Sequence, residues 1–167
     1  MNTGAITFSE NIDVNNLAFN KISKLATKWV KTLHKFNYQA VEINPSSFFT
    51  FQKTNNRAFS HFIPATLLTD GAWKNASEEP LRASLSLAYI IKQKQLNIKI
   101  DDVRLRQESD NSLHSGSMFY GNFFYEVTGN TKETRLQNVH QAISSWQEDF
   151  QIFQNLVNNK FFNLDSA

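Results

Sequence analysis

The stretch that decides the fold runs from residue 96 to residue 107 and reads LNIKIDDVRLRQ. Apolar residues alternate with polar ones on either side of a break at Asp101-Asp102; they are Leu96, Ile98, Ile100, Val103 and Leu105. Alternation with a period of two residues is typical of a strand that has one buried face. The stretch therefore predicts a strand over 96–107, with a bulge at the two aspartates.

The residues on the C-terminal side predict a strand that pairs with this one. Residues 109–116 are polar and contain a glycine, as expected for a hairpin connection, and residues 118–127 are aromatic-rich. Thr128-Gly129-Asn130 then carries a turn signal. We expect an antiparallel sheet built on these two strands.

Helical periodicity lies at both ends of the chain. Residues 14–36 carry apolar residues at spacings of three and four, namely Ala18, Ile22, Leu25, Trp29, Leu33 and Phe36, which predicts a long amphipathic helix. A second helix is expected from about residue 134 to residue 148, followed by a strand from Phe150. The alternative is that Phe150 and Phe153 continue the helical stripe.

The segments between these elements are shorter. Residues 38–43 and 48–51 read as two short strands, and residues 55–79 as short helical pieces and turns. Glu78-Glu79-Pro80 has the composition of a first helical turn, so a helix is expected over residues 81–91. The fold class is α+β, as a single domain of residues 1–167 that could divide into residues 1–77 and 78–167.

Composition excludes several kinds of chemistry. The 167 residues include no cysteine, which removes thiolate nucleophiles and Cys-ligated metal sites. The four histidines lie far apart in the sequence without metal-ligand spacing, and no phosphate-binding glycine loop or nucleophile elbow is present. We therefore assign no catalytic, cofactor-binding or metal-ligating residue.

Charge patterning supplies the candidate contact residues. A strip of lysines runs along one side of the first helix, formed by Lys21, Lys24, Lys28, Lys31 and Lys35. Such a strip could bind anionic lipid or the phosphates of nucleic acid, or it could be a solvated helix face. Arg104 and Arg106 would project from one strand face, as a partner contact or as ion-pair partners. The net charge of only +2 argues against nucleic acid as the partner.

The second half resembles the ferredoxin-like periplasmic domain of PilN-type and related type IV pilus or type II secretion inner-membrane proteins. The resemblance rests on residues 97–105, 125–131 and 149–152, and it implies an α-β-β-α-β order from residue 81 onward. It carries no invariant chemical motif.

A second resemblance covers the first half. Phe36-Asn37-Tyr38, residues 68–73 and residues 81–84 are similar to the nuclear-transport-factor-like cone of DotI/IcmL-type components of type IV secretion systems. That family would place more strand near the C-terminus than the helical stripe of residues 136–146 allows.

Both resemblances imply a non-catalytic domain of a bacterial secretion or pilus assembly apparatus that docks partner subunits and could form a homo-oligomer. The location would be periplasmic or inner-membrane-associated if a membrane anchor has been trimmed from the sequence, and cytoplasmic otherwise. Two alternatives stay open: a cone-shaped α+β protein that binds or isomerises a small apolar ligand, and nucleic-acid binding through the lysine strip.

Overall fold

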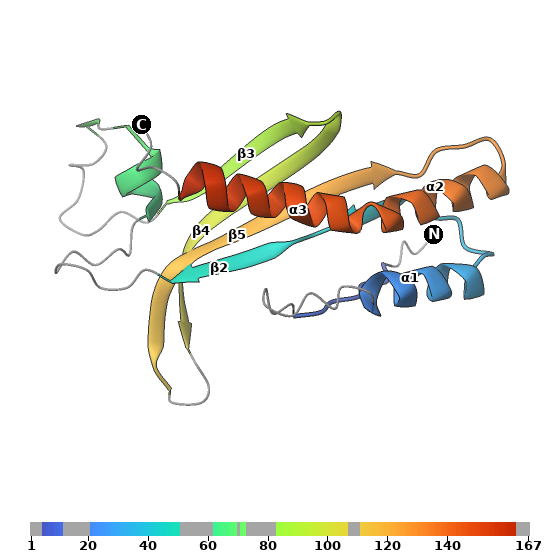
Figure 1. Ribbon diagram of the computed structural model, residues 1–167, viewed down its shortest axis with the longest axis horizontal. Helices are drawn as coiled ribbons and strands as arrows, with labels where there is room; N and C mark the ends of the chain where they lie inside the picture. The colour runs from blue at the N-terminus through green and yellow to red at the C-terminus, as the bar shows by residue number, and fades with distance from the viewer. Residues whose placement is uncertain are drawn as a thin grey trace. The chain divides into compact units, whose positions relative to one another are not determined.

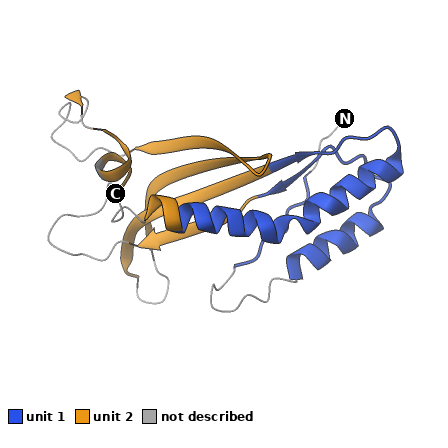
Figure 2. Cartoon of the chain, turned by 45° about the horizontal axis from the view of Figure 1, so that its top comes forward, with its two compact units in different colours: residues 1–43, 124–158 blue, residues 44–123, 159–167 orange. Residues whose placement is uncertain are grey.

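The computed structural model of the protein describes residues 5–11, 21–50, 62–69, 71–72, 83–106 and 111–162 (Figure 1). The chain divides into two compact units, each built from two separate segments (Figure 2). Unit 1 comprises residues 1–43 and 124–158, and unit 2 comprises residues 44–123 and 159–167. Each unit is therefore completed by chain from both halves of the sequence.

Unit 2 contains an antiparallel sheet with the strand order β2-β5-β4-β3. The strands are β2 (Ser46–Thr50), β3 (Ser84–Ile91), β4 (Lys94–Arg106) and β5 (Leu113–Glu126), and residues 124–126 of β5 belong to unit 1. Strands β3 and β4 are joined by Lys92-Gln93, with φ values of 50° and 66°. Two successive positive φ angles give the turn whose twist matches that of a hairpin.

One face of this sheet carries the core of unit 2. The register places Ile98 of β4 opposite Gly121 and Ile100 opposite Phe119, and both isoleucines and Phe119 are buried. Next to them lie Phe62, just before the π-helix η1 (Ile63–Leu67), and Phe161, with ring centroids 6.2 and 5.4 Å from that of Phe119. The aromatic residues are thus core material here.

Unit 1 is mainly helical. Its elements are α1 (Lys21–Thr32), β1 (Ala40–Ile43) beside β5, α2 (Lys132–Ser144) and α3 (Trp146–Leu156), after which the π-helix η3 (Val157–Phe161) leads into unit 2. Thr131 caps α2 by accepting a hydrogen bond from the Thr134 amide. The core of the unit joins Val30 of α1, Val139 and Ile143 of α2, and Val127.

The structure confirms the α+β class and corrects the expectation for residues 81–91, which is wrong. Residues 84–91 form strand β3 rather than a helix, and exposed and half-buried residues alternate along its whole length. The half-buried residues are Leu85, Leu87, Tyr89 and Ile91. Their two-residue period is the strand signal, and pairing with β4 outweighs the helix-like composition of residues 78–80.

The expected strand from Phe150 is also wrong, because residues 146–156 form α3. Ile152 and Phe153 are buried on it, which fits the alternative of a continued helical stripe. The bulge at Asp101-Asp102 is absent, since each residue from Leu96 to Arg106 has one partner on β5 in unbroken register. Strand β5 begins at Leu113, so part of the expected hairpin connection is strand, while residues 107–110 lie outside the described residues.

The first helix is shorter than expected at its C-terminal end. It ends at Thr32 instead of residue 36, and residues 14–20 lie outside the described residues. Its buried side also differs, because α1 packs through Val30 and Ala26, leaving Leu25 and Trp29 46% and 44% exposed. The stripe drawn through Leu25, Trp29 and Phe36 is therefore displaced from the side that faces the core.

Neither resemblance describes the order of elements in the second half. From residue 83 onward the described elements run β3-β4-β5-α2-α3-η3, not α-β-β-α-β. The described residues after Glu126 form helices and turns, whereas the second resemblance implies strand there. Residues 55–61, 70 and 73–79 of the expected helical pieces and turns lie outside the described residues. None of the described helices has both the length and the apolar composition needed to cross a membrane.

Candidate functional site

The expected lysine strip is present. Lys21, Lys24, Lys28 and Lys31 lie on α1 and Lys35 in the turn after it, and all five side chains are exposed. Among the residues that the structure describes, no carboxylate lies within salt-bridge distance of these five ammonium groups. The strip is therefore a region of positive charge that no described carboxylate pairs with.

Three of the five lysines line a groove in unit 1. Lys24, Lys28 and Lys31 form one wall together with the hydroxyl-bearing residues Ser23 and Thr27. The opposite wall is the junction of α2 and α3, and its lining residues are Ile143, Ser144, Trp146 and Gln147. The groove has a volume of about 470 Å³. It combines three positive charges with hydroxyl groups, an amide and an indole ring.

Two features of unit 1 position the walls of the groove. Val30 of α1 packs against Val139 and Ile143 of α2, which fixes the distance between the two helices. The start of α3 is fixed by Asp149, which is fully buried and accepts a hydrogen bond from Tyr125 of β5, with 2.6 Å between the two oxygens. The core of unit 1 thus sets the position of Trp146 relative to the lysines.

The flank of α1 away from the groove is partly apolar. Leu25 and Trp29 are exposed there, and the ring centroid of Trp29 lies 6.3 Å from that of Phe8. Helical geometry places residues 25 and 29 on one line and residues 24, 28 and 31 on the neighbouring one. A ligand in the groove would contact lysines and Trp146, and only a ligand that also covers α1 would reach Trp29.

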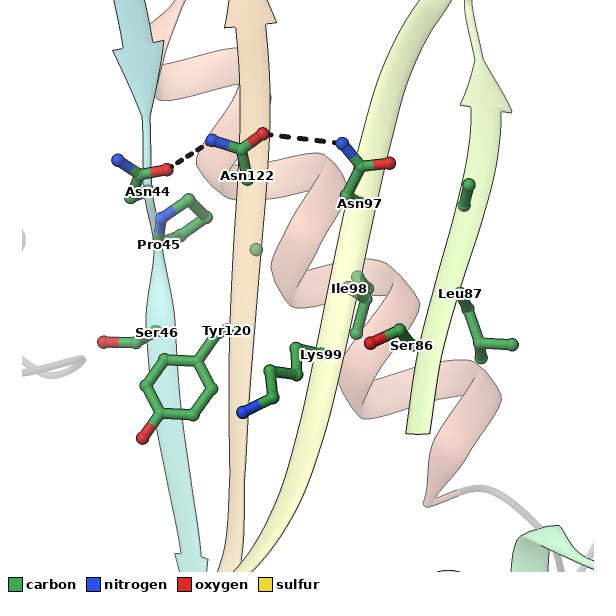
Figure 3. Close-up of a pocket in the computed structure, with 12 residues that line it drawn as sticks. Asn44, Pro45, Ser46, Ser86, Leu87, Asn97, Ile98, Lys99, Tyr120 and Asn122 are labelled. Atoms are coloured by element: carbon green, nitrogen blue, oxygen red, sulfur yellow. Dashed lines mark hydrogen bonds between the residues drawn. The ribbon is translucent and has the colours of Figure 1, made fainter. Parts of the chain in front are cut away.

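A second pocket lies on the open face of the sheet in unit 2 and has a volume of about 600 Å³ (Figure 3). Its residues form two rows across the strands. The register aligns Ser46, Tyr120, Lys99 and Ser86 in one row, and Asn122, Asn97 and Ala88 in the next. Polar side chains from four strands therefore converge on one surface.

Amide groups form a chain along the second row. Gln95 donates to Asn97 over 3.0 Å. Asn97 donates to Asn122 and Asn122 donates to Asn44, with donor–acceptor distances of 3.5 and 2.7 Å (Figure 3). This series of hydrogen-bonded amides ends at the amide nitrogen of Asn44, which donates to no group among the described residues. This amide N–H₂ lines the pocket and can donate to a ligand there.

Lys99 in the first row is held by Asp101, with its ammonium nitrogen 2.6 Å from a carboxylate oxygen. The hydrogen bond from Lys99 to Asp101 and the charge of that carboxylate raise the pKa of Lys99. Burial alone would raise the pKa of Asp101, but hydrogen bonds from Lys99 and Ser84 and the charge of Lys99 hold it below 3.8. The pocket on the open face therefore has almost no net charge.

The polar side chains that line the two pockets are amide, hydroxyl, ammonium and indole groups. The residues that line them include no carboxylate and no histidine. Across the described part of the chain, no cluster of three or more His, Cys, Asp or Glu side chains could hold a metal ion. In unit 2, Asp102 accepts a hydrogen bond from Ser117 at 2.7 Å. In unit 1, Asp149 accepts a hydrogen bond from Tyr125. Neither carboxylate lines either of the two pockets.

Arg104 and Arg106 lie on the part of β4 that extends past β3, opposite Ser115 and Leu113 of β5. Both are exposed, and no ion pair to either is found among the described residues. They do not line either pocket. Their side chains place positive charge along a strand edge that β3 leaves uncovered.

The lysine strip could be found from sequence because its spacing is local. The opposite wall of the groove could not, since it depends on how α1 packs against α2. The amide chain also lacks a sequence signal, because Asn44 and Asn122 are separated by 78 positions and meet only through strand register.

Comparisons of the chain with known proteins and structures found no match. No protein-family model, no curated protein and no solved structure matches the chain.

Proposed function

We propose that the protein is a non-catalytic interaction domain that binds an acidic segment of a partner protein in the lysine groove of unit 1. The setting that goes with this proposal is a bacterial secretion or pilus assembly apparatus, in which the domain docks partner subunits. The setting rests on the two sequence resemblances, and the binding mode rests on the geometry of the groove.

The observation that carries the proposal is the charge of the groove. Lys24, Lys28 and Lys31 line it from one helix, and no described carboxylate pairs with them. Uncompensated charges of one sign attract a ligand of the opposite sign and keep out ligands of the same sign. A protein segment with several Glu or Asp side chains on one side, in either a helical or an extended conformation, supplies the negative charge that the three lysines would attract.

The shape of the surface favours a protein segment over a lipid bilayer or nucleic acid. A bilayer is flat and would meet all five lysines of the strip alike, whereas the groove gathers three of them opposite Trp146 and Ile143. Proteins that bind nucleic acid usually have a larger excess of basic residues than the net charge of +2 of this chain. A groove that combines charge with an indole ring suits a segment with both acidic and apolar side chains.

The magnitude of the charge contribution can be bounded. An exposed ion pair contributes about 0.2–1 kcal/mol, so three lysines contribute roughly 0.6–3 kcal/mol of binding free energy. This corresponds to an affinity difference of about 3- to 150-fold. The remaining affinity would come from contacts with Trp146 and with the hydroxyl and amide groups that line the groove.

Binding of a short fluorescein-labelled peptide rich in Glu and Leu, followed by fluorescence anisotropy, tests the proposal. The variant K24Q/K28Q/K31Q removes the groove lysines, and K21Q/K35Q removes two lysines of the strip that do not line the groove. We expect the triple variant to weaken binding by about 3- to 150-fold, the range that three ion pairs allow. The double variant should leave the affinity nearly unchanged, with a loss of less than about twofold.

Equal losses per lysine in the two variants would contradict the groove and favour a flat anionic surface. Vesicles that contain phosphatidylserine and a single-stranded oligonucleotide serve as the other two ligands in the same assay. Tighter binding to either than to the peptide, measured at the same ionic strength, would overturn the choice of an acidic protein segment. The envelope setting is tested separately by fractionating cells of the source organism, where recovery of the protein only in the cytosol would contradict it.

A further inference from the structure

Strand β3 is the last strand of the sheet in unit 2, and no other strand of the described residues lies beyond it (Figure 1). Among the described strands it pairs with β4 alone, over all eight residues from Ser84 to Ile91. Within the described chain, no backbone group of these residues bonds to anything beyond β4. Since the backbone N–H and C=O groups of successive strand residues point alternately to the two sides, every second residue of β3 directs its donor and acceptor to this edge.

The edge lacks the features that normally prevent strand addition. Its sequence, SLSLAYII, contains no charged residue and no proline, and the side chain of Ile90 is 74% exposed. Native proteins usually protect such an edge with charge, proline, bulges or a very short strand. An uncharged edge of eight residues in regular register is therefore prepared to pair with another strand.

The rest of the same sheet shows those protective features. On the other side of the sheet, β2 has only five residues and follows Pro45, which has no N–H to offer. Where β4 extends past the described part of β3, it carries the exposed side chains of Arg104 and Arg106. Among these described edges, β3 alone lacks such protection, so it is the edge of the described sheet that can accept a further strand.

We propose that this further strand belongs to a second copy of the chain, whose β3 pairs antiparallel with the first across a two-fold axis. The pattern of β3 is self-complementary, because antiparallel pairing centred on Leu87 or on Ala88 keeps every half-buried residue facing a half-buried residue. No like charges face each other in either register, because the strand has none. The two sheets would then form one continuous sheet through the axis.

Analytical ultracentrifugation of the full chain over a concentration series tests the proposal. The wild-type protein should pass from the 19.2 kDa monomer to a dimer of twice that mass, with a dissociation constant between about 1 µM and 1 mM. Ser86→Lys places two like charges next to the axis. It should raise the dissociation constant at least about tenfold.

The matched control is Ser46→Lys. Ser46 and Ser86 are both exposed and lie at the two ends of one cross-strand row, but Ser46 is on β2. The control should leave the dimer unchanged. Circular dichroism and thermal unfolding at low concentration establish that both variants are folded, so that a loss of the dimer in S86K is not a loss of structure.

Cross-linking gives a second readout, and the absence of native cysteines makes it free of background. Directly opposed residues of antiparallel strands have Cα separations of about 4.5–5.5 Å, which a disulfide can span. Under mild oxidation, A88C should cross-link with itself, or S86C should cross-link with A88C, depending on which residue lies on the axis. S46C should not cross-link.

A protein that sediments as a monomer up to about 1 mM would overturn the proposal. A dimer that persists in S86K, and in which neither A88C with itself nor S86C with A88C forms a cross-link, would also overturn the proposal. Neither outcome would bear on the lysine groove, since the groove and the edge of β3 belong to different units.

Discussion

The hydrogen bond between Tyr125 and Asp149 should be a major determinant of the stability of unit 1. The carboxylate of Asp149 is fully buried and accepts the hydroxyl of Tyr125 at 2.6 Å. A hydrogen bond to a charged group contributes about 1.5–3 kcal/mol, and its loss leaves a buried acceptor with one bond fewer. We therefore expect Tyr125→Phe to lower the free energy of unfolding by about 1.5–3 kcal/mol.

For a chain of this length 1 kcal/mol corresponds to about 2–4 °C in Tm, so the expected decrease is roughly 3–12 °C. Urea unfolding followed by circular dichroism measures the free energy, and a thermal scan measures Tm. Tyr120→Phe is the matched control, because Tyr120 is 41% exposed and its hydroxyl bonds to no described residue. It should change the free energy of unfolding by less than about 0.5 kcal/mol.

The same variant connects stability to binding. Asp149 lies within the first turn of α3, next to Trp146 and Gln147 of the groove. If Tyr125 fixes this turn, Tyr125→Phe should also weaken binding of the Glu-rich peptide at temperatures where the variant remains folded. A Tyr125→Phe protein that unfolds within 0.5 kcal/mol of wild type would refute the view that this bond holds α3 in place.

Three further predictions follow from local geometry. Thr131→Ala removes the side-chain cap of α2 and should cost about 1 kcal/mol in urea unfolding; an unchanged midpoint would mean that the cap is not formed. Gly116→Ala should destabilise the protein by about 1–3 kcal/mol, because the added Cβ would collide with the carbonyl oxygen of Phe49; a neutral change would contradict the close approach of β2 and β5. Because the pKa of Asp101 is lowered in the folded protein, its contribution to stability is present above pH 3.8 and is lost as pH falls through the folded pKa. Lys99→Met should move the titration midpoint of the Asp101 carboxyl group upward in an NMR titration, and a midpoint that stays in place would exclude Lys99 as a cause.

Local patterns predicted those elements whose period is unambiguous. The alternation in residues 96–107 gave β4, and the spacing of apolar residues gave α2, because both are decided by residues that are close in sequence. The five lysines could be assigned to one side of a helix for the same reason. Strand β3 was missed although it alternates, because residues 78–80 have the composition of a helix start and Leu and Ala favour helices.

The remaining features depend on pairing between distant segments. Strand register brings Asn44 beside Asn122, and it brings Ser46 into one row with Ser86. The periodicity of a single segment does not indicate which residues of another segment will lie beside it. The buried side of α1 is set by Val139 and Ile143 of α2, so the stripe drawn through Leu25 and Trp29 could not show which side faces the core. Long-range packing thus decides both pockets, whereas local sequence decides only the elements that carry them.

The central claim, that an acidic segment binds in the groove, is tested most directly by the indole N–H signals in ¹⁵N-resolved NMR spectra. Trp146 lines the groove and Trp29 lies on the other flank of α1, so the two signals report on the two sides of the helix. On titration with the Glu-rich peptide, we expect the Trp146 indole signal to shift until it saturates, and the shift to disappear in K24Q/K28Q/K31Q. A Trp146 signal that does not move when the peptide is bound would contradict the claim.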